Sequence, residues 1–165
     1  MYNFTAALPL EPFWVAGFTS GDGSFNLTIK SPEAKKGYRV SLRFSINLNV
    51  RELDVIKGLV TFFNLHETKV SKIANVSAIE TNVIDQHIYI SEKSVTLQIT
   101  KISDIVDTII PFFEKYPILG VKSLDFADFQ TVAKIVVAKE HLTPEGFKEI
   151  LEIKSNMNQN RRSAR

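Results

Sequence analysis

The clearest pattern in the chain is a strict alternation of apolar and polar residues over one central segment. From Tyr38 to Leu48 every second residue is apolar, and polar residues stand between them. Successive side chains of a strand point to opposite faces, so this pattern predicts a strand with one face on a core and one in water. The predicted inward residues are Tyr38, Val40, Leu42, Phe44, Ile46 and Leu48, and the outward ones are Arg39, Ser41, Arg43, Ser45 and Asn47.

The same alternation predicts further strands on either side. Phe25, Leu27 and Ile29 point inward in a preceding strand, and Ser31–Gly37 supplies the turn because it contains Pro32 and Gly37. Later strands are expected at Lys69–Ile73 and Val95–Thr100, and the latter directs Val95, Leu97 and Ile99 inward. Ala74–Gln86 is irregular and is expected to form a long loop, while His87–Ser91 is compatible with an additional strand.

Helical spacing replaces the alternation between and after the strands. Apolar residues recur at helical intervals in three segments. They are Leu53, Ile56, Val60 and Phe63; Val106, Ile109, Ile110 and Phe113; and Phe129, Val132, Ala133 and Val136. Ser103 is the predicted cap of the second helix, which ends before Pro117. Thr143 followed by Pro144 is typical of a helix start and predicts a final helix.

The order of elements is helix, two strands, helix, two strands, helices. It predicts an α+β fold in which an antiparallel sheet carries helices on one face. No repeat or linker is visible, so we expect a single domain over residues 1–165 with a core at about 12–158. The polar and basic ending that begins at Asn158, and above all the tail 159–165, is expected to fray.

Composition limits the chemistry more than it identifies it. The chain has 165 residues and a net charge of only +2, so overall charge does not mark a nucleic-acid binder. It has no cysteine, which excludes disulfides, thiolate zinc sites and cysteine nucleophiles. No apolar run approaches the roughly 18 residues of a membrane helix, and Met1–Pro9 does not resemble a secretory signal. We therefore expect no membrane partner.

The outward face of the predicted sheet is polar and carries no acidic residue. Its members are Asn26, Thr28, Lys30, Arg39, Ser41, Arg43, Ser45, Asn47, Thr96, Gln98 and Thr100. From Lys30 to Arg43 five basic residues, including Lys35 and Lys36, stand against Glu33 alone. Such side chains donate to phosphates and read base edges, and a sheet ribbon can enter the major groove. A solvated sheet face also favours Thr, Ser and Lys, so composition alone leaves both interpretations open.

A second feature is the segment Phe13–Phe25, with the sequence FWVAGFTSGDGSF. Its apolar start predicts a short helix, which Gly21, Asp22 and Gly23 break directly into the first strand. Gly17 and Gly21 lie four residues apart, so one face of the helix lacks side chains and another backbone can approach closely. Taken alone, G-x-x-x-G indicates packing within a chain and G-D-G a plain turn.

These residues do not stand alone. Val15–Gly23 resembles the nonapeptide that names the LAGLIDADG homing endonucleases, and the predicted elements fit that family's αββαββα core. The stretches Phe113–Lys122, Lys139–Gly146 and Ile153–Asn158 also look like parts of the fungal mitochondrial, two-motif members. The similarity covers roughly residues 12–158 and is closest to the C-terminal half of such enzymes.

The resemblance implies a half-domain with a curved sheet and a metal-dependent mechanism. In that family two motif helices pack side by side, and each presents its last acidic residue, here Asp22, to Mg²⁺ or another divalent cation such as Mn²⁺ or Ca²⁺. Gly21 is implied as a second metal ligand, and Lys122 as a basic catalytic residue near the scissile phosphate. The family's earlier acidic position is Ser20 here, which implies packing or capping. The implied dimer interface is Phe13, Ala16, Gly17, Ser20 and Gly21.

The resemblance also implies a partner and a target. One motif per chain supplies one metal carboxylate, so cutting both strands requires a homodimer or a second LAGLIDADG half, and a homodimer reads pseudo-palindromic double-stranded DNA. DNA contacts are expected at all the outward residues given above and at Lys35, Lys36, Lys69 and Ser71. The family's origin implies a mitochondrial location. Where the family often has Gln this chain has Leu48, which keeps open a catalytically weak or silent relative acting as an RNA-binding intron maturase or a DNA-binding protein.

Overall fold

The computed structural model describes residues 9–30, 38–65 and 86–160, and within them helices and strands follow the predicted order. The elements are α1 (Pro12–Asp22), β1 (Gly23–Lys30), β2 (Arg39–Asn49), η1 (Val50–Glu52), α2 (Leu53–Phe62), β3 (Ile88–Ile90), β4 (Ser94–Ile99), α3 (Ile102–Asp104), η2 (Ile105–Ile109), α4 (Ile110–Lys115), α5 (Lys122–Val137), η3 (Glu140–Leu142) and α6 (Pro144–Asn156). The predicted turn Ser31–Gly37, the strand Lys69–Ile73 and nearly all of the loop Ala74–Gln86 lie outside the described residues.

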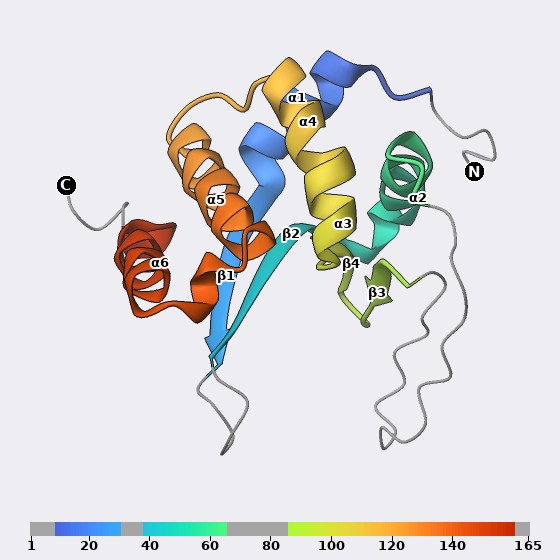
Figure 1. Cartoon of the computed structure of the whole chain (residues 1–165). Coiled ribbons are helices and arrows are strands. Elements are labelled where there is room, and N and C mark those ends of the chain that lie inside the picture. Colours follow the sequence, from blue (N-terminus) through green and yellow to red (C-terminus); the bar gives the residue numbers. More distant parts are fainter. Residues whose placement is uncertain (1–8, 31–37, 66–85, 161–165) are drawn as a thin grey trace, which may run out of the picture.

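The strands form one antiparallel sheet in the order β1-β2-β4-β3. Figure 1 shows the helices gathered along one side of these strands, as the α+β prediction requires. The additional strand at His87–Ser91 is confirmed as β3, which pairs with β4. None of the helices in the described part of the chain is long and apolar enough to cross a membrane.

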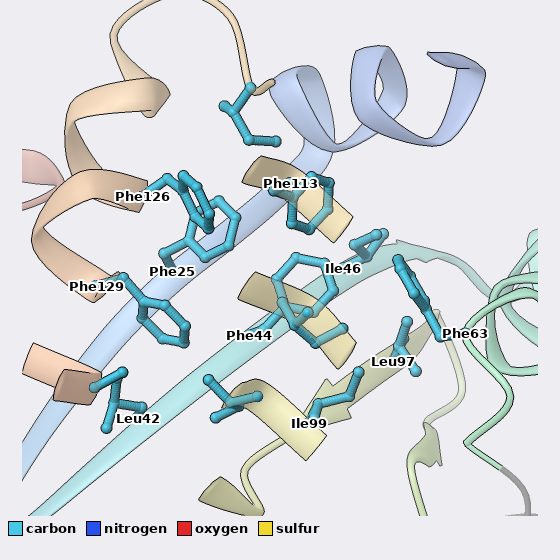
Figure 2. Close-up of a cluster of buried hydrophobic side chains, with 14 of the residues drawn as sticks. Phe25, Leu42, Phe44, Ile46, Phe63, Leu97, Ile99, Phe113, Phe126 and Phe129 are labelled. Atoms are coloured by element: carbon cyan, nitrogen blue, oxygen red, sulfur yellow. The ribbon is translucent and has the colours of Figure 1, made fainter. Parts of the chain in front are cut away.

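Phenylalanine side chains fill the space between the sheet and the helices (Figure 2). Phe25 of β1 lies with its ring centroid 5.3 Å from Phe44 of β2 and 5.8 Å from Phe113 of α4. Two rings of α5, Phe126 and Phe129, close the other side of Phe25 at 5.2 and 5.3 Å. The central inward residues of β1 and β2 are therefore buried as the alternation predicted, and Ile29, Val40 and Leu48 near the strand ends are partly buried against the same core.

The helix expected after Ser103 differs from the prediction in its start and in its buried face. It begins at Ile102 with Lys101 as the cap, so Ser103 lies within its first turn. Pro111 lacks a backbone N–H and crowds the carbonyl one turn earlier, and the chain takes a wide π-helical turn over Ile105–Ile109 in that region. Ile105, Ile109 and Phe113 are buried and the expected residues Val106 and Ile110 are partly buried against the core, so the predicted apolar face is confirmed and Ile105 is added to it.

Two smaller predictions at the ends of elements are corrected. Tyr38 was expected inward, but β2 begins only at Arg39, and Tyr38 is 47% exposed and stacks on Phe147 of α6 at 4.0 Å between ring centroids. Asn158 was expected to fray, but its backbone N–H donates to the buried carboxylate of Asp125 at 2.9 Å. The predicted cap of the last helix is confirmed, because the Thr143 hydroxyl accepts from the Gly146 N–H.

Candidate functional site

The motif segment forms a helix that runs directly into the sheet. Residues Val15, Ala16 and Thr19 bury one side of α1 in the core, which fixes the direction of the helix. Gly21 and Asp22 complete the helix rather than breaking it, and β1 begins at Gly23. Asp22 is therefore the last helical residue, and its carboxylate is exposed at the tip of α1.

Gly23 makes this direct transition from helix to strand possible. It is buried, and a Cβ at this position would lie 2.7 Å from the Thr19 carbonyl oxygen and still closer to the Thr19 side chain. Real Cβ atoms do not approach backbone oxygen so closely, and Thr19 is itself fully buried and cannot move away. The placement of Asp22 beside the sheet thus depends on glycine at the following position.

We expect Gly23→Ala to lower the free energy of unfolding by about 1–3 kcal/mol because the added methyl group overpacks the junction. Gly21→Ala is the matched control, since nothing lies within 4 Å of a Cβ there and alanine favours a helix. Urea unfolding followed by circular dichroism, below the concentration at which the chain associates, measures both variants. Equal stability of the two variants would contradict the role assigned to Gly23.

Lys122 reaches the same corner from a distant part of the sequence. It is the first residue of α5, and its ammonium donates to the Gly21 carbonyl at 2.7 Å and to the Thr19 carbonyl at 3.2 Å. The C-terminal end of a helix carries partial negative charge, so a cation is favoured there. The structure therefore brings the predicted residues Gly21, Asp22 and Lys122 together, and Lys122 is more than a solvated lysine at a helix start.

Ser20 fastens the loop that carries Lys122. Its hydroxyl donates to the Ala16 carbonyl at 2.8 Å and accepts from the Leu119 N–H at 3.0 Å. The loop before α5 is thus held against α1 by a hydroxyl where the family's pattern has an acid. This contact occupies Ser20 within the chain, which fits the packing role that the resemblance implied.

The site offers oxygen ligands for a hard cation and little else. Asp22 provides one exposed carboxylate, and the Gly21 carbonyl, although it accepts from Lys122, provides a second oxygen. Among the described residues no group of three or more His, Cys, Asp or Glu side chains could hold a metal ion. A single carboxylate fits Mg²⁺ or Ca²⁺ when phosphate oxygens or a second chain complete the shell, and it does not fit a closed structural zinc site.

The outward face of α1 is largely uncovered by the rest of the described chain. Nothing lies within 4 Å of a Cβ built at Gly17 or Gly21, so these glycines are not used for packing within the described part of the chain. Phe13 is 74% exposed, and Leu119 is 70% exposed. Ala16 is corrected as an interface residue, because it is buried in this chain's own core. We call Phe13, Trp14, Gly17 and Gly21 the bare face of α1.

The predicted outward residues of the strands share one face of the sheet. The register places Asn26 opposite Arg43, Thr28 opposite Ser41, Lys30 opposite Arg39, Ser45 opposite Gln98 and Asn47 opposite Thr96. Asn47 also donates to the Thr96 hydroxyl across the strands. Thr100 follows the end of β4, while Lys35, Lys36, Lys69 and Ser71 lie outside the described residues.

The register adds four residues to this face that the sequence pattern did not identify. Ser24, Asn49 and Ser94 lie at strand ends, where a period of two is hard to recognise, and Tyr89 lies in a three-residue strand opposite Thr96. None of the outward strand residues in the described part of the chain is acidic. Leu48 points to the other face and is partly buried against the core. We call the outward strand residues the polar sheet face.

A bare helix that ends in an exposed carboxylate beside a polar sheet face matches a known family. The sequence model of the family described as "LAGLIDADG endonuclease" matches residues 15–92 and 80–133 of this chain. The chain belongs to the LAGLIDADG endonuclease family. Two Neurospora crassa relatives are named "Probable intron-encoded endonuclease": number 2 is 37% identical over 155 residues and number 3 is 31% identical over 141, covering 92% and 86% of this chain.

Solved LAGLIDADG structures share the fold. The meganuclease I-CpaMI bound to uncleaved DNA aligns with a TM-score of 0.75 and 44% identity over 91% of this chain. I-SmaMI, bound to an uncleaved DNA target in the presence of calcium ions, aligns with a TM-score of 0.71 and 35% identity over 90% of it. This LAGLIDADG chain spans 46% and 45% of those two chains, and 29% and 23% of the two curated relatives.

Proposed function

We propose that this chain is one half of a site-specific, double-strand DNA endonuclease that hydrolyses phosphodiester bonds with divalent cations. The observation that carries the proposal is the single exposed carboxylate of Asp22 at the end of a bare helix, with the Lys122 ammonium held at the same end. One carboxylate cannot complete the coordination shell of a metal ion, but it suits a site in which DNA phosphates and a second half supply the other ligands. DNA bound to the related meganucleases supports the choice of substrate.

In this proposal each residue of the corner has a defined task. Asp22, with the Gly21 carbonyl, would hold Mg²⁺, or Mn²⁺ or Ca²⁺ in its place, for cleavage across the minor groove. Such a cation would polarise the phosphodiester, activate water and stabilise the leaving oxygen. Lys122 supplies fixed positive charge beside Asp22, which favours binding of the scissile phosphate and the extra charge of its transition state. Ser20 keeps the loop before Lys122 in place.

The bare face of α1 is the proposed contact with the other half. Two such helices can approach closely because Gly17 and Gly21 have no side chains. The partner is a second copy of this chain, which would then read pseudo-palindromic DNA, or a second LAGLIDADG half in a longer chain. The solved relatives, about twice as long as this chain, support the second arrangement as a real alternative. The intron-encoded relatives support an organellar, mitochondrial location.

A silent relative that binds RNA as an intron maturase, or binds DNA without cutting, is the second candidate. It is favoured by Leu48, which places an apolar side chain where the family often has Gln. The two candidates differ in one experiment: incubation of the purified chain with a randomised DNA library and MgCl₂, followed by sequencing of cleaved ends. The endonuclease proposal expects a recurrent cut sequence that disappears with EDTA. Binding without any cut ends would favour the silent relative.

The polar sheet face is the proposed reader of DNA sequence, and Arg43 occupies its centre. If the face lies in the major groove, Arg43 can donate two hydrogen bonds to a guanine edge, and we expect Arg43→Ala to cost about 1–3 kcal/mol of discrimination at one or two base positions. Removing a phosphate contact should instead weaken all sequences alike, which we expect of Lys36→Ala, a residue outside the described part of the chain.

Binding to a panel of single-base variants of the recovered site measures this difference. Lys134→Ala, an exposed charge change on α5 away from the sheet, is the control and should leave the panel unchanged. If Arg43→Ala scales every affinity by one factor, the face attracts DNA electrostatically and does not read bases through Arg43.

A further inference from the structure

The residues that follow α6 contact the edge of the sheet formed by β1. Within the described residues β1 is an edge strand, so carbonyls on its outer side have no strand partner there. After α6 ends, Met157 is 3% exposed in the core, and Asn158 adopts a left-handed conformation with φ +57°. The Asn158 side-chain amide donates to the Phe25 carbonyl at 3.1 Å, and its backbone N–H donates to Asp125.

Asp125 makes this attachment specific. Its carboxylate is 2% exposed, within the first turn of α5, and accepts the Asn158 N–H at 2.9 Å. A buried carboxylate is retained only where hydrogen bonds satisfy it. Asn158 is therefore held at two points, by its backbone N–H on Asp125 of α5 and by its side-chain amide on Phe25 of β1.

This attachment creates a polar groove of about 420 Å³ along the edge of the sheet. Its polar lining is Ser24, Asn26, Lys154, Asn158, Gln159 and Asn160. Lys154 is the only charged residue among the described residues that line it, and none is acidic. Hydroxyl, amide and ammonium groups are the donors that proteins use on phosphate and sugar oxygens.

The groove adjoins the polar sheet face and the end of β1 near Asp22. Ser24 and Asn26 belong to the polar sheet face, opposite Ser45 and Arg43, so the groove is continuous with that face. Ser24 is only two residues from Asp22, so the groove lies at the end of β1 where the proposed cleavage site is. A polyanion that runs past the cleavage corner suits this surface better than a peptide or a small apolar molecule.

We propose that this groove holds the sugar–phosphate backbone of one DNA strand beside the point of cleavage, and so extends DNA binding from the sheet to the C-terminal segment. The inference rests on the proposed endonuclease function. Lys154 supplies a phosphate contact, while Asn158 is a positioning residue that holds the segment. The contact is independent of base identity, because the groove borders the strand edge and presents donors for phosphate.

The salt dependence of binding tests the contact. We expect Lys154→Gln to reduce the slope of log K against log[KCl] by about 0.9, the value of one phosphate contact, for a fluorescein-labelled duplex of scrambled sequence. Lys148→Gln, an exposed lysine of α6 that does not line the groove, should keep the wild-type slope. An unchanged slope in Lys154→Gln would overturn the groove proposal and leave the endonuclease proposal standing. If the wild-type chain shows no salt-dependent binding to DNA, both proposals fail.

A tethered cleavage reagent tests the position directly. The chain has no cysteine, so Asn160→Cys provides a unique thiol for an iron–EDTA probe. We expect radical cuts on one strand, centred next to the scissile phosphates recovered from the library, whereas the same probe at Glu149→Cys on α6 should give no focused cuts. Focused cuts far from the cleavage point, or cuts from the Asn160→Cys probe only on an RNA duplex, would overturn the assignment. Thermal melting of each variant verifies that it is folded.

Discussion

Replacement of Asp22 by Asn is expected to abolish DNA cleavage while binding remains. The amide has nearly the same shape as the carboxylate but lacks its charge, so the proposed metal site would lose the only anionic ligand that the described residues place at the tip of α1. We expect the single-turnover cleavage rate to fall by about a thousandfold or more, equivalent to roughly 4 kcal/mol of transition-state stabilisation. DNA affinity, measured by anisotropy with Ca²⁺ present, should stay within about threefold because phosphate contacts elsewhere dominate it.

Asp22→Asn should leave the stability of the fold nearly unchanged. Asp22 places negative charge at the C-terminal end of α1, where the helix dipole disfavours it, but the Lys122 ammonium at the same end attracts it, so the two effects oppose each other. We therefore expect the urea midpoint of the variant to stay close to that of wild type. Asp107→Asn is the matched control, an exposed carboxylate in η2, and should change neither cleavage nor affinity. Cleavage by Asp22→Asn at a rate near wild type would remove Asp22 from the mechanism.

The strands were predictable because the polar sheet face and the core impose opposite demands on alternate residues. In β2 a shift of one residue would move Phe44 to the solvent and Arg43 into the core, so the sequence pattern leaves one register. The prediction weakened where that constraint ends. Tyr38 lies before the strand, and its ring is covered by Phe147, which is more than a hundred residues away in the sequence.

Helix spacing was less reliable where the backbone departs from ideal geometry. Pro111 follows a π-helical turn at Ile105–Ile109, and the sequence pattern did not identify Ile105, which is fully buried, as a core residue. The contacts within the candidate site were even harder to predict from the sequence. Asp22 and Lys122 were implied by the family resemblance, but nothing in the local sequence shows that Lys122 binds the carbonyls of Gly21 and Thr19.

In the C-terminal segment the local sequence predicted fraying at a residue that tertiary contacts hold in place. The polar ending from Asn158 is typical of a frayed tail, yet Asn158 is held by Asp125 and by the edge of β1. A lone acid in the first turn of a helix has an ordinary local explanation, since it favours the helix dipole. Only the tertiary fold reveals that the Asp125 carboxylate is buried and has a second task.

Gly17→Leu is expected to weaken assembly without weakening the fold, and this combination identifies the bare face as an interface. Nothing in the described part of the chain lies within 4 Å of a Cβ at Gly17, and the residue is exposed, so the leucine side chain can extend toward solvent. Leucine also favours a helix over glycine by up to about 1 kcal/mol, so the unfolding free energy of the isolated subunit should be unchanged or raised. If two α1 helices touch at this position, the side chain forces them apart.

Overpacking of this kind commonly costs about 1–3 kcal/mol, which corresponds to a dimer weakened roughly 5- to 150-fold. Sedimentation velocity across a micromolar concentration series, with and without the recovered DNA site, measures the shift from dimer to monomer. Ala127→Leu adds a similar bulk at an exposed position of α5 and should leave the dimer intact. A wild-type chain that remains a monomer, both alone and on the full-length DNA site, would show that its partner is not a second copy. The second half of a longer chain would then be the remaining candidate partner for the bare face, where Phe13 is 74% exposed.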